Sequence, residues 1–262
     1  MPSLIYLMGP AGCGKSTLTS ALHDAISAQE LDSITINLDP GVEWLPYTPD
    51  IDIRTYVSLS DVMKEFRLGP NGALIVAVDL VVNHLPEIRE MVEKWNVDYV
   101  IVDTPGQMEL FAFRETGPAV VESLSPAGDS MVLFLIDSFF AKNPSSFVSM
   151  LMLASSVIAR FRRPQLNVLT KSDAVEPAVL ERTAGWMEKK SMLLEALMEE
   201  PNPLERETAI GILESIEKMS FSGELLAVSA THNSGIVELL AAIERALGKE
   251  RELDVQKETE IL

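Results

Sequence analysis

The stretch from Leu4 to Leu18, L-I-Y-L-M-G-P-A-G-C-G-K-S-T-L, decides the fold of this chain. A short apolar run comes first, then a glycine-rich turn, then residues that favour a helix. Gly9, Gly14, Lys15 and Ser16 match the spacing G-x-x-x-x-G-K-[ST]. In such a loop, backbone N–H groups can close around phosphate oxygens because glycine has no Cβ to hold them apart. The stretch therefore predicts a P-loop and a nucleotide site.

Some residues of this predicted P-loop are expected to bind the phosphates, and one is expected to bind a metal ion. Lys15 reaches the β- and γ-phosphates, and the Ser16 hydroxyl ligates Mg²⁺. Gly14 opens the helix, whose N-terminus carries unpaired N–H groups and partial positive charge. Further contacts with the nucleotide are expected from Gly12, Cys13 and Thr17.

Composition restricts the classes of protein and partner. The 262 residues allow one large α/β domain with a modest insertion. The net charge of −18 argues against direct binding of nucleic acid or of an anionic membrane. A single cysteine, Cys13, cannot form a disulfide within the chain, which fits the cytoplasm. The chain has no uncharged apolar run of 18 residues, so no membrane span is expected.

Strands and helices are predicted to alternate along the chain. Apolar runs and alternation predict strands at residues 4–8, 33–39, 97–102, 131–136, 166–169 and 225–228. Helical spacing predicts helices at residues 15–30, 61–68 (capped by Ser60), 73–95 (with a boundary near Pro86), 144–162, 178–199, 204–219 and 236–247. In residues 73–95, β-branched side chains favour a strand, but the length and spacing favour a helix.

This alternation predicts an α/β fold, namely a mostly parallel sheet covered by helices on both faces. We expect residues 1–248 to form one P-loop domain, with a small helical insertion at about 176–222. A charged tail, 249–262, follows. The ends of five predicted strands lead into Gly9, Asp39, Asp103, Thr170 and Ser229. Because parallel strands present their carboxyl ends at one edge, these segments should meet in one crevice.

The segment D-T-P-G-Q, residues 103–107, looks like the second phosphate-sensing motif of P-loop GTPases. Asp103 can hold Mg²⁺ through water, and the Gly106 N–H can meet the γ-phosphate. The Gln107 amide can orient an attacking water, because it both donates and accepts hydrogen bonds. The structural alternative is a simple turn at the end of a strand.

The segment T-K-S-D, residues 170–173, resembles the guanine-reading motif N-K-x-D. The Asp173 carboxylate can accept hydrogen bonds from guanine N1–H and the 2-amino group, and the Lys171 stem can lie over the base. Thr170 stands where that motif has Asn, so one contact is changed. Ser229 and Ala230 resemble the loop whose backbone N–H meets guanine O6. A polar turn after a strand is the alternative for both segments.

Gly69-Pro70-Asn71, taken alone, is typical of a helix stop. In order with the P-loop, Asp39, D-T-P-G-Q-M-E and T-K-S-D, however, it resembles the signature of the GPN-loop GTPases over about residues 3–247. This resemblance implies a homodimeric GTPase that binds GTP or GDP, with a fold shared with signal-recognition GTPases and MinD-like ATPases. It also implies a link to RNA polymerase assembly, which is known for eukaryotic members.

By the same resemblance, the Asn of the Gly-Pro-Asn loop, here Asn71, reaches into the partner's site. The implied catalytic residues are Lys15, Asp39, Asn71, Asp103, Gln107 and Glu109, and the implied Mg²⁺ site is Ser16, Asp39 and Asp103. The nucleotide motifs contain no arginine, so a neutral Asn from the partner could complete the site without adding charge. Two alternatives stay open: an ATP-dependent P-loop kinase, and an assembly chaperone in which slow GTP turnover times the binding of a client.

Overall fold

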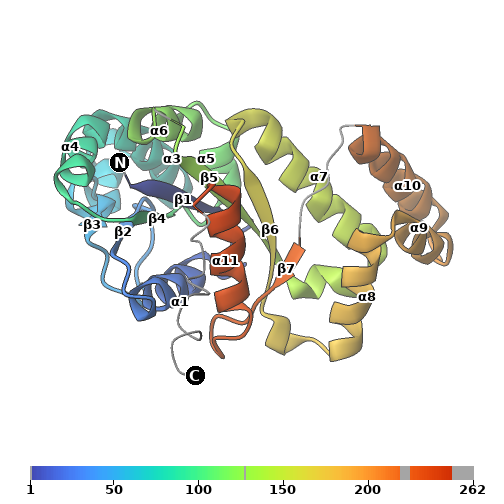
Figure 1. Ribbon diagram of the computed structural model, residues 1–262. Coiled ribbons are helices and arrows are strands. Elements are labelled where there is room, and N and C mark those ends of the chain that lie inside the picture. Colours follow the sequence, from blue (N-terminus) through green and yellow to red (C-terminus); the bar gives the residue numbers. More distant parts are fainter. Residues whose placement is uncertain (1, 127, 219–224, 250–262) are drawn as a thin grey trace, which may run out of the picture.

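A computed structural model of the chain describes residues 2–126, 128–218 and 225–249. Its centre is a seven-stranded sheet in the order β3-β2-β4-β1-β5-β6-β7, with every pairing parallel (Figure 1). The strands are β1 (Ser3–Met8), β2 (Ser33–Asn37), β3 (Ile51–Asp52), β4 (Tyr99–Asp103), β5 (Ser130–Asp137), β6 (Gln165–Thr170) and β7 (Leu225–Ala227). The predicted α/β fold with a parallel sheet is confirmed.

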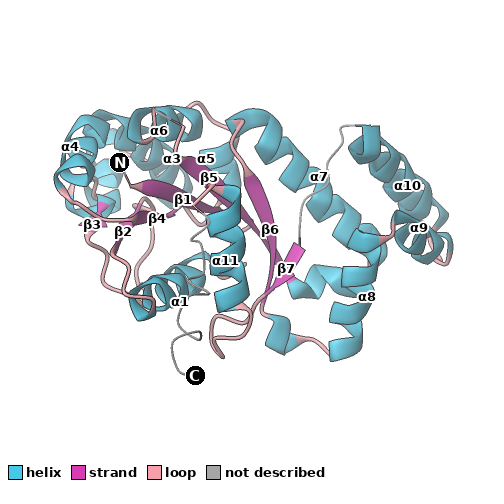
Figure 2. Cartoon of the chain, viewed as in Figure 1, coloured by secondary structure: helices cyan, strands magenta, loops and turns pink. Residues whose placement is uncertain are grey.

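Helices cover both faces of this sheet (Figure 2). They are α1 (Lys15–Ala28), α2 (Leu59–Phe66), α3 (Pro70–Leu80), α4 (Leu85–Lys94), α5 (Met108–Ala112), α6 (Thr116–Leu124), α7 (Pro144–Phe161), α8 (Pro177–Glu188), α9 (Lys190–Met198), α10 (Pro203–Lys218) and α11 (Ile236–Ala246). Short 3₁₀ helices occupy Ile53–Thr55, Val81–His84, Ser138–Lys142 and Ser172–Ala174.

The core lies in two layers, one on each face of the sheet. Successive side chains of a strand point to opposite faces, so Tyr6 of β1 joins one layer and Ile5 joins the other. The first layer contains side chains from α2–α10, and the second contains side chains from α1 and α11. Because both faces are covered, the central strands are apolar almost throughout, and β1 and β4 are buried at every position.

The strand register brings the site segments to the same edge of the sheet. Asp103 at the end of β4 pairs with Leu7 of β1 on one side and with Asn37 of β2 on the other. On the far side of β1, Asp137 of β5 pairs with Thr170 of β6. The loops that follow β1, β2, β4 and β6 therefore leave the sheet side by side, as the predicted crevice requires.

Several predicted boundaries are wrong in instructive ways. The cap of α2 is Ser58, whose hydroxyl accepts from the Asp61 N–H at 3.4 Å, and not Ser60. The region 73–95 is helical, but it forms α3 and α4 with a 3₁₀ turn between them, and Pro86 lies in the first turn of α4, near the predicted boundary. Residues 178–199 form two helices, α8 and α9, because Lys189 is extended.

Sequence reasoning missed the short strand β3 and the helices α5 and α6. Helices α8, α9 and α10 occupy the segment 176–222 that is expected to be a helical insertion, and α9 and α10 lie at the end of the molecule away from β2 and β3 (Figure 1). Residues 219–222 of that segment and 250–262 of the predicted tail lie outside the described residues.

Two helical segments, Pro70–Lys94 and Pro144–Phe161, are long and apolar enough to cross a membrane by length and composition alone. Both contribute to the core: Ala77 and Ile88 from the first segment and Val148 and Ala154 from the second are fully buried. A buried core helix passes the same test, so these segments are weak evidence for a span. The expectation of no membrane span stays a prediction.

Candidate active site

The loop between β1 and α1 has the backbone that the glycine pattern predicts. Gly9, Gly12 and Gly14 have φ angles of 154°, 76° and 94°, and Gly14 caps α1. A Cβ on Gly9 would lie 2.6 Å from the Leu135 carbonyl oxygen and 2.9 Å from Cys13 Sγ. Glycine is therefore required at Gly9 by the close approach of β5. Cys13 is buried, and this burial raises the pKa of its thiol, which fits a packing role.

Lys15 connects the P-loop to the D-T-P-G-Q segment. Its Nζ donates to the carbonyl oxygens of Gly9 at 2.8 Å, Pro10 at 3.1 Å and Gly106 at 3.1 Å. The side chain is almost fully buried. The ammonium group is thus held over the mouth of the P-loop, between the two segments that are expected to surround the terminal phosphates.

Asp39 also binds the D-T-P-G-Q segment, and a buried asparagine orients it. Asp39 Oδ2 accepts the Gly106 N–H at 2.7 Å, and Oδ1 accepts the Gly41 N–H at 2.8 Å. Asn37 accepts the Asp39 N–H at 3.0 Å and donates to the Asp39 carbonyl at 3.3 Å. In this structure the Gly106 N–H, expected at the γ-phosphate, is therefore bonded to Asp39.

Asp103 is the most deeply buried carboxylate of the site. It is 2% exposed, and Tyr47 donates its hydroxyl to Asp103 Oδ2 at 3.0 Å. Burial raises the Asp103 pKa to about 6; the neighbouring Ser16, Tyr47 and Lys15 oppose the rise, and Asp39 adds to it. Tyr47 is half-buried, and its desolvation together with the nearby Asp103 charge raises its pKa well above the usual range.

The Mg²⁺ site expected at Ser16, Asp39 and Asp103 fits these observations. Within the described part of the chain, Asp103 Oδ1 is buried and has no hydrogen-bond partner. A buried oxygen in this condition suits the water shell of a hard cation, and a cation nearby would favour the ionised carboxylate. The described residues hold no group of three or more His, Cys, Asp or Glu suited to a metal. Ligands for Mg²⁺ would therefore come from Ser16, water and phosphate as well as from carboxylates.

The three other predicted catalytic side chains are exposed. Gln107 is the cap of α5 and Glu109 lies in its first turn. Asn71 is exposed in the first turn of α3. The Gly-Pro-Asn segment is a helix start and not a helix stop: α2 ends at Phe66 with Arg67 left-handed, Gly69 caps α3, and Pro70 opens it. The helix therefore carries Asn71 on its free end.

The residues expected to read the base lie together beyond β6 and β7. Thr170 donates its hydroxyl to the Cys13 carbonyl at 2.7 Å, so it holds the P-loop backbone. Lys171, with a left-handed φ of 55°, donates to the Gly12 carbonyl at 2.6 Å and to Asp137 at 2.7 Å. The Ser229 hydroxyl holds the pKa of the Asp173 carboxyl below its usual range.

Sequence reasoning missed several residues of this site. Asn37 and Tyr47 position Asp39 and Asp103, Asp137 holds Lys171, and His232 lies 3.7 Å from Asp173. Asp137 had a signal, since it ends a buried strand, but Tyr47 lies in a proline-rich loop with no pattern to single it out. The remaining predicted residues, Thr17 and Ala230, lie at the start of α1 and in the loop after β7.

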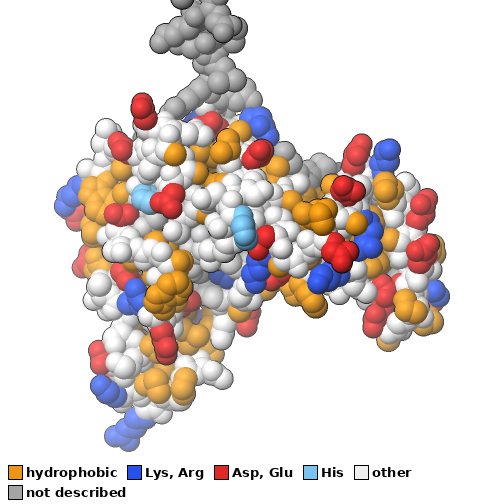
Figure 3. Space-filling model, turned by 90° about the horizontal axis from the view of Figure 1, so that it is seen from below, with side chains coloured by type: hydrophobic (Ala, Val, Ile, Leu, Met, Phe, Trp, Pro, Cys, Tyr) orange, Lys and Arg blue, Asp and Glu red, His pale blue; other side chains and the backbone are white. Residues whose placement is uncertain are grey.

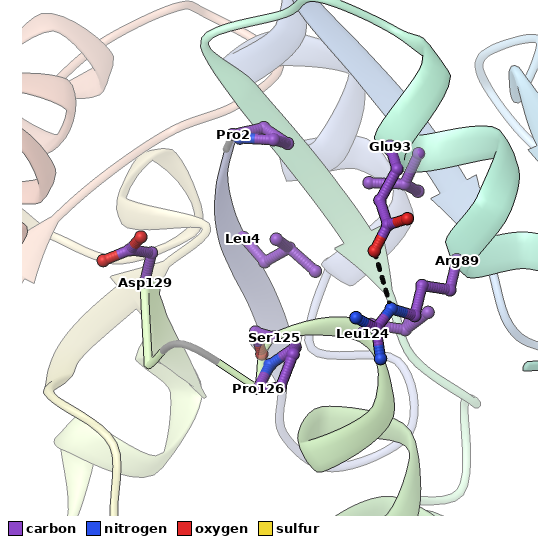
Figure 4. Close-up of a pocket in the computed structure, with 9 residues that line it drawn as sticks. Pro2, Leu4, Arg89, Glu93, Leu124, Ser125, Pro126 and Asp129 are labelled. Carbon is purple, nitrogen blue, oxygen red and sulfur yellow. Dashed lines mark hydrogen bonds and ion pairs between the residues drawn. The ribbon is translucent and has the colours of Figure 1, made fainter. Parts of the chain in front are cut away.

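The small cavity in Figure 4 does not belong to this site. It holds about 20 Å³ between Pro2, Leu4 and Asp129, at the amino ends of the strands, with the Arg89–Glu93 ion pair on its rim. That is room for about one water molecule. Viewed from below, the molecule carries both signs of charge and several separate hydrophobic groups (Figure 3).

The fold and the phosphate loop define an α/β protein of the P-loop NTPase class. The family model described as "Conserved hypothetical ATP binding protein" matches residues 7–249. GPN-loop GTPase 1 of Dictyostelium discoideum is 31% identical over 245 residues, which cover 92% of this chain and 61% of that protein. GPN-loop GTPase 3 of Mycosarcoma maydis is 33% identical over 190 residues, which cover 72% of this chain and 68% of that protein. The chain belongs to the GPN-loop GTPase family.

A solved structure agrees over nearly the whole fold. A GTPase from Pyrococcus abyssi, in its apo form, superposes with a TM-score of 0.82 at 27% identity, covering 93% of this chain and 97% of that one. The chain spans less than two thirds of the Dictyostelium relative's length.

Proposed function

We propose that this chain is a Mg²⁺-dependent GTPase that hydrolyses GTP to GDP and phosphate as a homodimer. The observation that carries the proposal is the meeting of Lys15, Asp39 and Gly106 at the P-loop, joined by hydrogen bonds of 2.7–3.1 Å. The named relatives are GTPases, which supports the same activity. The expectation of cytoplasmic location is part of the proposal.

In this proposal the residues of the chain bind the phosphates, orient the attacking water and stabilise the charge on the transferring phosphoryl group. Lys15 leaves its carbonyl partners to stabilise charge on the transferring phosphoryl group, and the Gly106 N–H exchanges Asp39 for a γ-phosphate oxygen. Gln107 orients the attacking water, with Glu109 near it in the same helical turn. Mg²⁺, held by Ser16 with Asp39 and Asp103 through water, would neutralise phosphate charge.

The exchange at Gly106 also supports a conformational switch. The Asp39–Gly106 bond is available only when no γ-phosphate occupies the N–H, so hydrolysis would return the D-T-P-G-Q segment to Asp39. A change of this kind could time the binding of a protein client. By family resemblance the candidate clients are RNA polymerase subunits, and a pull-down with the GTP-locked protein tests this part of the proposal.

The dimer is proposed because Asn71, which is expected to act in catalysis, is exposed and is expected to reach the site of a partner subunit. Asn71 projects from the free end of α3, and large aromatic side chains are exposed close in sequence to the motifs: Trp44 after Asp39, and Phe66 before Gly69. Exposed aromatic side chains of this kind are typical of protein interfaces. Asn71 of the partner subunit would then donate its amide to the phosphate or to the attacking water.

Guanine specificity is proposed from Asp173, whose side chain is 35% exposed and whose pKa the Ser229 hydroxyl holds below the usual range, so that the carboxylate can accept hydrogen bonds from the base. ATP is the competing substrate, because the family model's description names ATP. The test measures turnover of GTP and ATP with and without Mg²⁺. Equal turnover of ATP and GTP would refute the guanine specificity.

Asn71→Ala should lower kcat for GTP by roughly 10²–10³-fold with little change in nucleotide Kd, because the lost donor acts mainly in the transition state. An unchanged kcat for Asn71→Ala would refute the role of Asn71 in the transition state.

A further inference from the structure

Helix α3 carries Asn71 at one end and lies against the loop that carries Asp39. A Cβ on Gly41 would lie 2.7 Å from Leu74 Cδ1, so the first turns of α3 pack directly on this loop. Ala73 and Ala77 of the same helix are fully buried. Any tilt of α3 would therefore move Asn71 and disturb the loop beside the P-loop.

The other end of α3 is bound to the segment that follows the D-T-P-G-Q motif. Asp79 accepts from Arg114 through both carboxylate oxygens, with Nε at 3.0 Å from Oδ1 and Nη2 bonded to Oδ2. The Thr116 hydroxyl donates to Oδ1 at 2.8 Å. Arg114 lies between α6 and α5, which begins next to Gln107, and Thr116 is the first residue of α6. A bidentate Arg–carboxylate contact fixes the relative orientation of the two side chains as well as their distance.

The segment on the far side of this contact is itself firmly held. A Cβ on Gly117 would lie 2.3 Å from the Phe111 carbonyl oxygen, so α6 approaches α5 as closely as glycine allows. Arg160 of α7 donates to the carbonyl oxygens of Ala112 at 3.1 Å and Arg114 at 3.0 Å. The Asp79 contact thus links α3 to a fixed part of the core and not to a loose loop.

We propose that the Asp79–Arg114 pair is a positioning contact for GTP hydrolysis. The pair holds α3 in place, so that Asn71, roughly 12 Å away along the helix, stays fixed relative to the segment that carries Gln107 and Glu109. The inference rests on the function proposed above for Asn71. In a symmetric dimer each α3 would then connect the water-orienting segment of its own site to the Asn71 that it delivers to the other site.

The test is a double-mutant cycle with Asp79→Asn and Asn71→Ala, measured as kcat for GTP. Asp79→Asn should lower kcat about tenfold and leave KM and nucleotide Kd within about twofold, as expected when coupling between distant groups is lost. Asp79→Glu, which keeps a carboxylate, should restore part of kcat. In the Asn71→Ala background, Asp79→Asn should lower kcat by less than about twofold, because the group that it positions is gone.

Controls separate positioning from general stability. Glu217→Gln removes the Lys190–Glu217 pair, in which both side chains are 43–59% exposed, and the Asp79 and Arg114 side chains are each 40% exposed. This control should leave kcat unchanged. Should Asp79→Asn fold poorly, Thr116→Val removes only the hydroxyl contact and should lower kcat by about twofold, again only when Asn71 is present.

The outcomes distinguish this inference from the proposed function. The same fold-loss for Asp79→Asn with and without Asn71 would show that the pair acts independently of Asn71, and would overturn the inference. A wild-type kcat for Asp79→Asn would overturn it as well. If Asn71→Ala keeps wild-type kcat, or if the wild type does not hydrolyse GTP, the proposed function fails, and the inference falls with it.

Discussion

Replacing Thr170 with Val tests the structural role that the guanine-motif position has in this chain. The Thr170 hydroxyl donates to the Cys13 carbonyl at 2.7 Å and lies 3.2 Å from the Ile136 carbonyl, and the side chain is buried. Valine has nearly the same shape but no donor, so the Cys13 carbonyl loses its partner on Thr170. The cost of leaving a buried acceptor unpaired is about 1–3 kcal/mol. For a chain of this size, we expect Tm to fall by roughly 3–10 °C.

Thr183→Val is the matched control. Thr183 is fully buried in α8, and its hydroxyl donates at 2.7 Å to the Val179 carbonyl. That carbonyl lies four residues earlier in the same helix, so it also accepts a backbone N–H. Loss of the Thr183 hydroxyl therefore leaves the Val179 carbonyl oxygen with a hydrogen-bond partner. We expect this variant to lose less than about 1 kcal/mol of stability.

The two variants should also differ in nucleotide binding. Thr170→Val loosens the P-loop backbone, which contacts phosphate, so the Kd values for GDP and ADP should rise by a similar factor. Thr183→Val should leave both unchanged. Thermal unfolding by circular dichroism and titration calorimetry measure these effects. Equal Tm values for the two variants, or a changed GDP-to-ADP ratio for Thr170→Val, would refute the assignment of Thr170 to the P-loop.

Three further predictions address the proposed reaction. Lys15→Ala should abolish turnover while leaving the circular dichroism spectrum unchanged; hydrolysis at the wild-type rate would end the P-loop interpretation. Asp173→Asn should shift preference from guanine toward xanthine nucleotides, because an amide donates where the carboxylate accepted; competition binding measures this, and an unshifted preference counts against base reading by Asp173. The protein should sediment as a dimer at micromolar concentration, and a monomer at full turnover would contradict the composite site.

The fold was largely readable from the sequence because its central strands are buried on both faces and therefore appear as apolar runs. The elements that escaped prediction are short or fixed by tertiary contacts. β3 has two residues, and α6 depends on the close approach at Gly117, which no local pattern reveals. The split between α8 and α9 at Lys189 has no proline or glycine to mark it.

Site residues could be predicted from the sequence where the chemistry requires a fixed motif spacing. Residues that position them from distant parts of the sequence could not be predicted. The P-loop and Asp39 follow strands, Asp103 and Thr170 end strands, and parallel topology brings all of them to one edge of the sheet. Tyr47 reaches Asp103 across 56 positions in the sequence, and Arg114 reaches Asp79 across 35. The Gly-Pro-Asn segment shows a further limit, since glycine before proline fits the end of one helix as well as the start of the next.

The central claim, a site completed by Asn71 of the partner subunit, is tested most directly by mixing two inactive variants. Asn71→Ala and Gln107→Ala are combined in equal amounts, and subunit exchange is confirmed with differently tagged chains. In a mixed dimer one composite site carries both lesions and the other carries neither, and half of the dimers are mixed when exchange is random. GTP turnover should therefore recover to roughly a quarter of wild type per subunit, provided that the sites act independently. Turnover that stays at the level of the single variants despite confirmed exchange would contradict action across the dimer by independent sites.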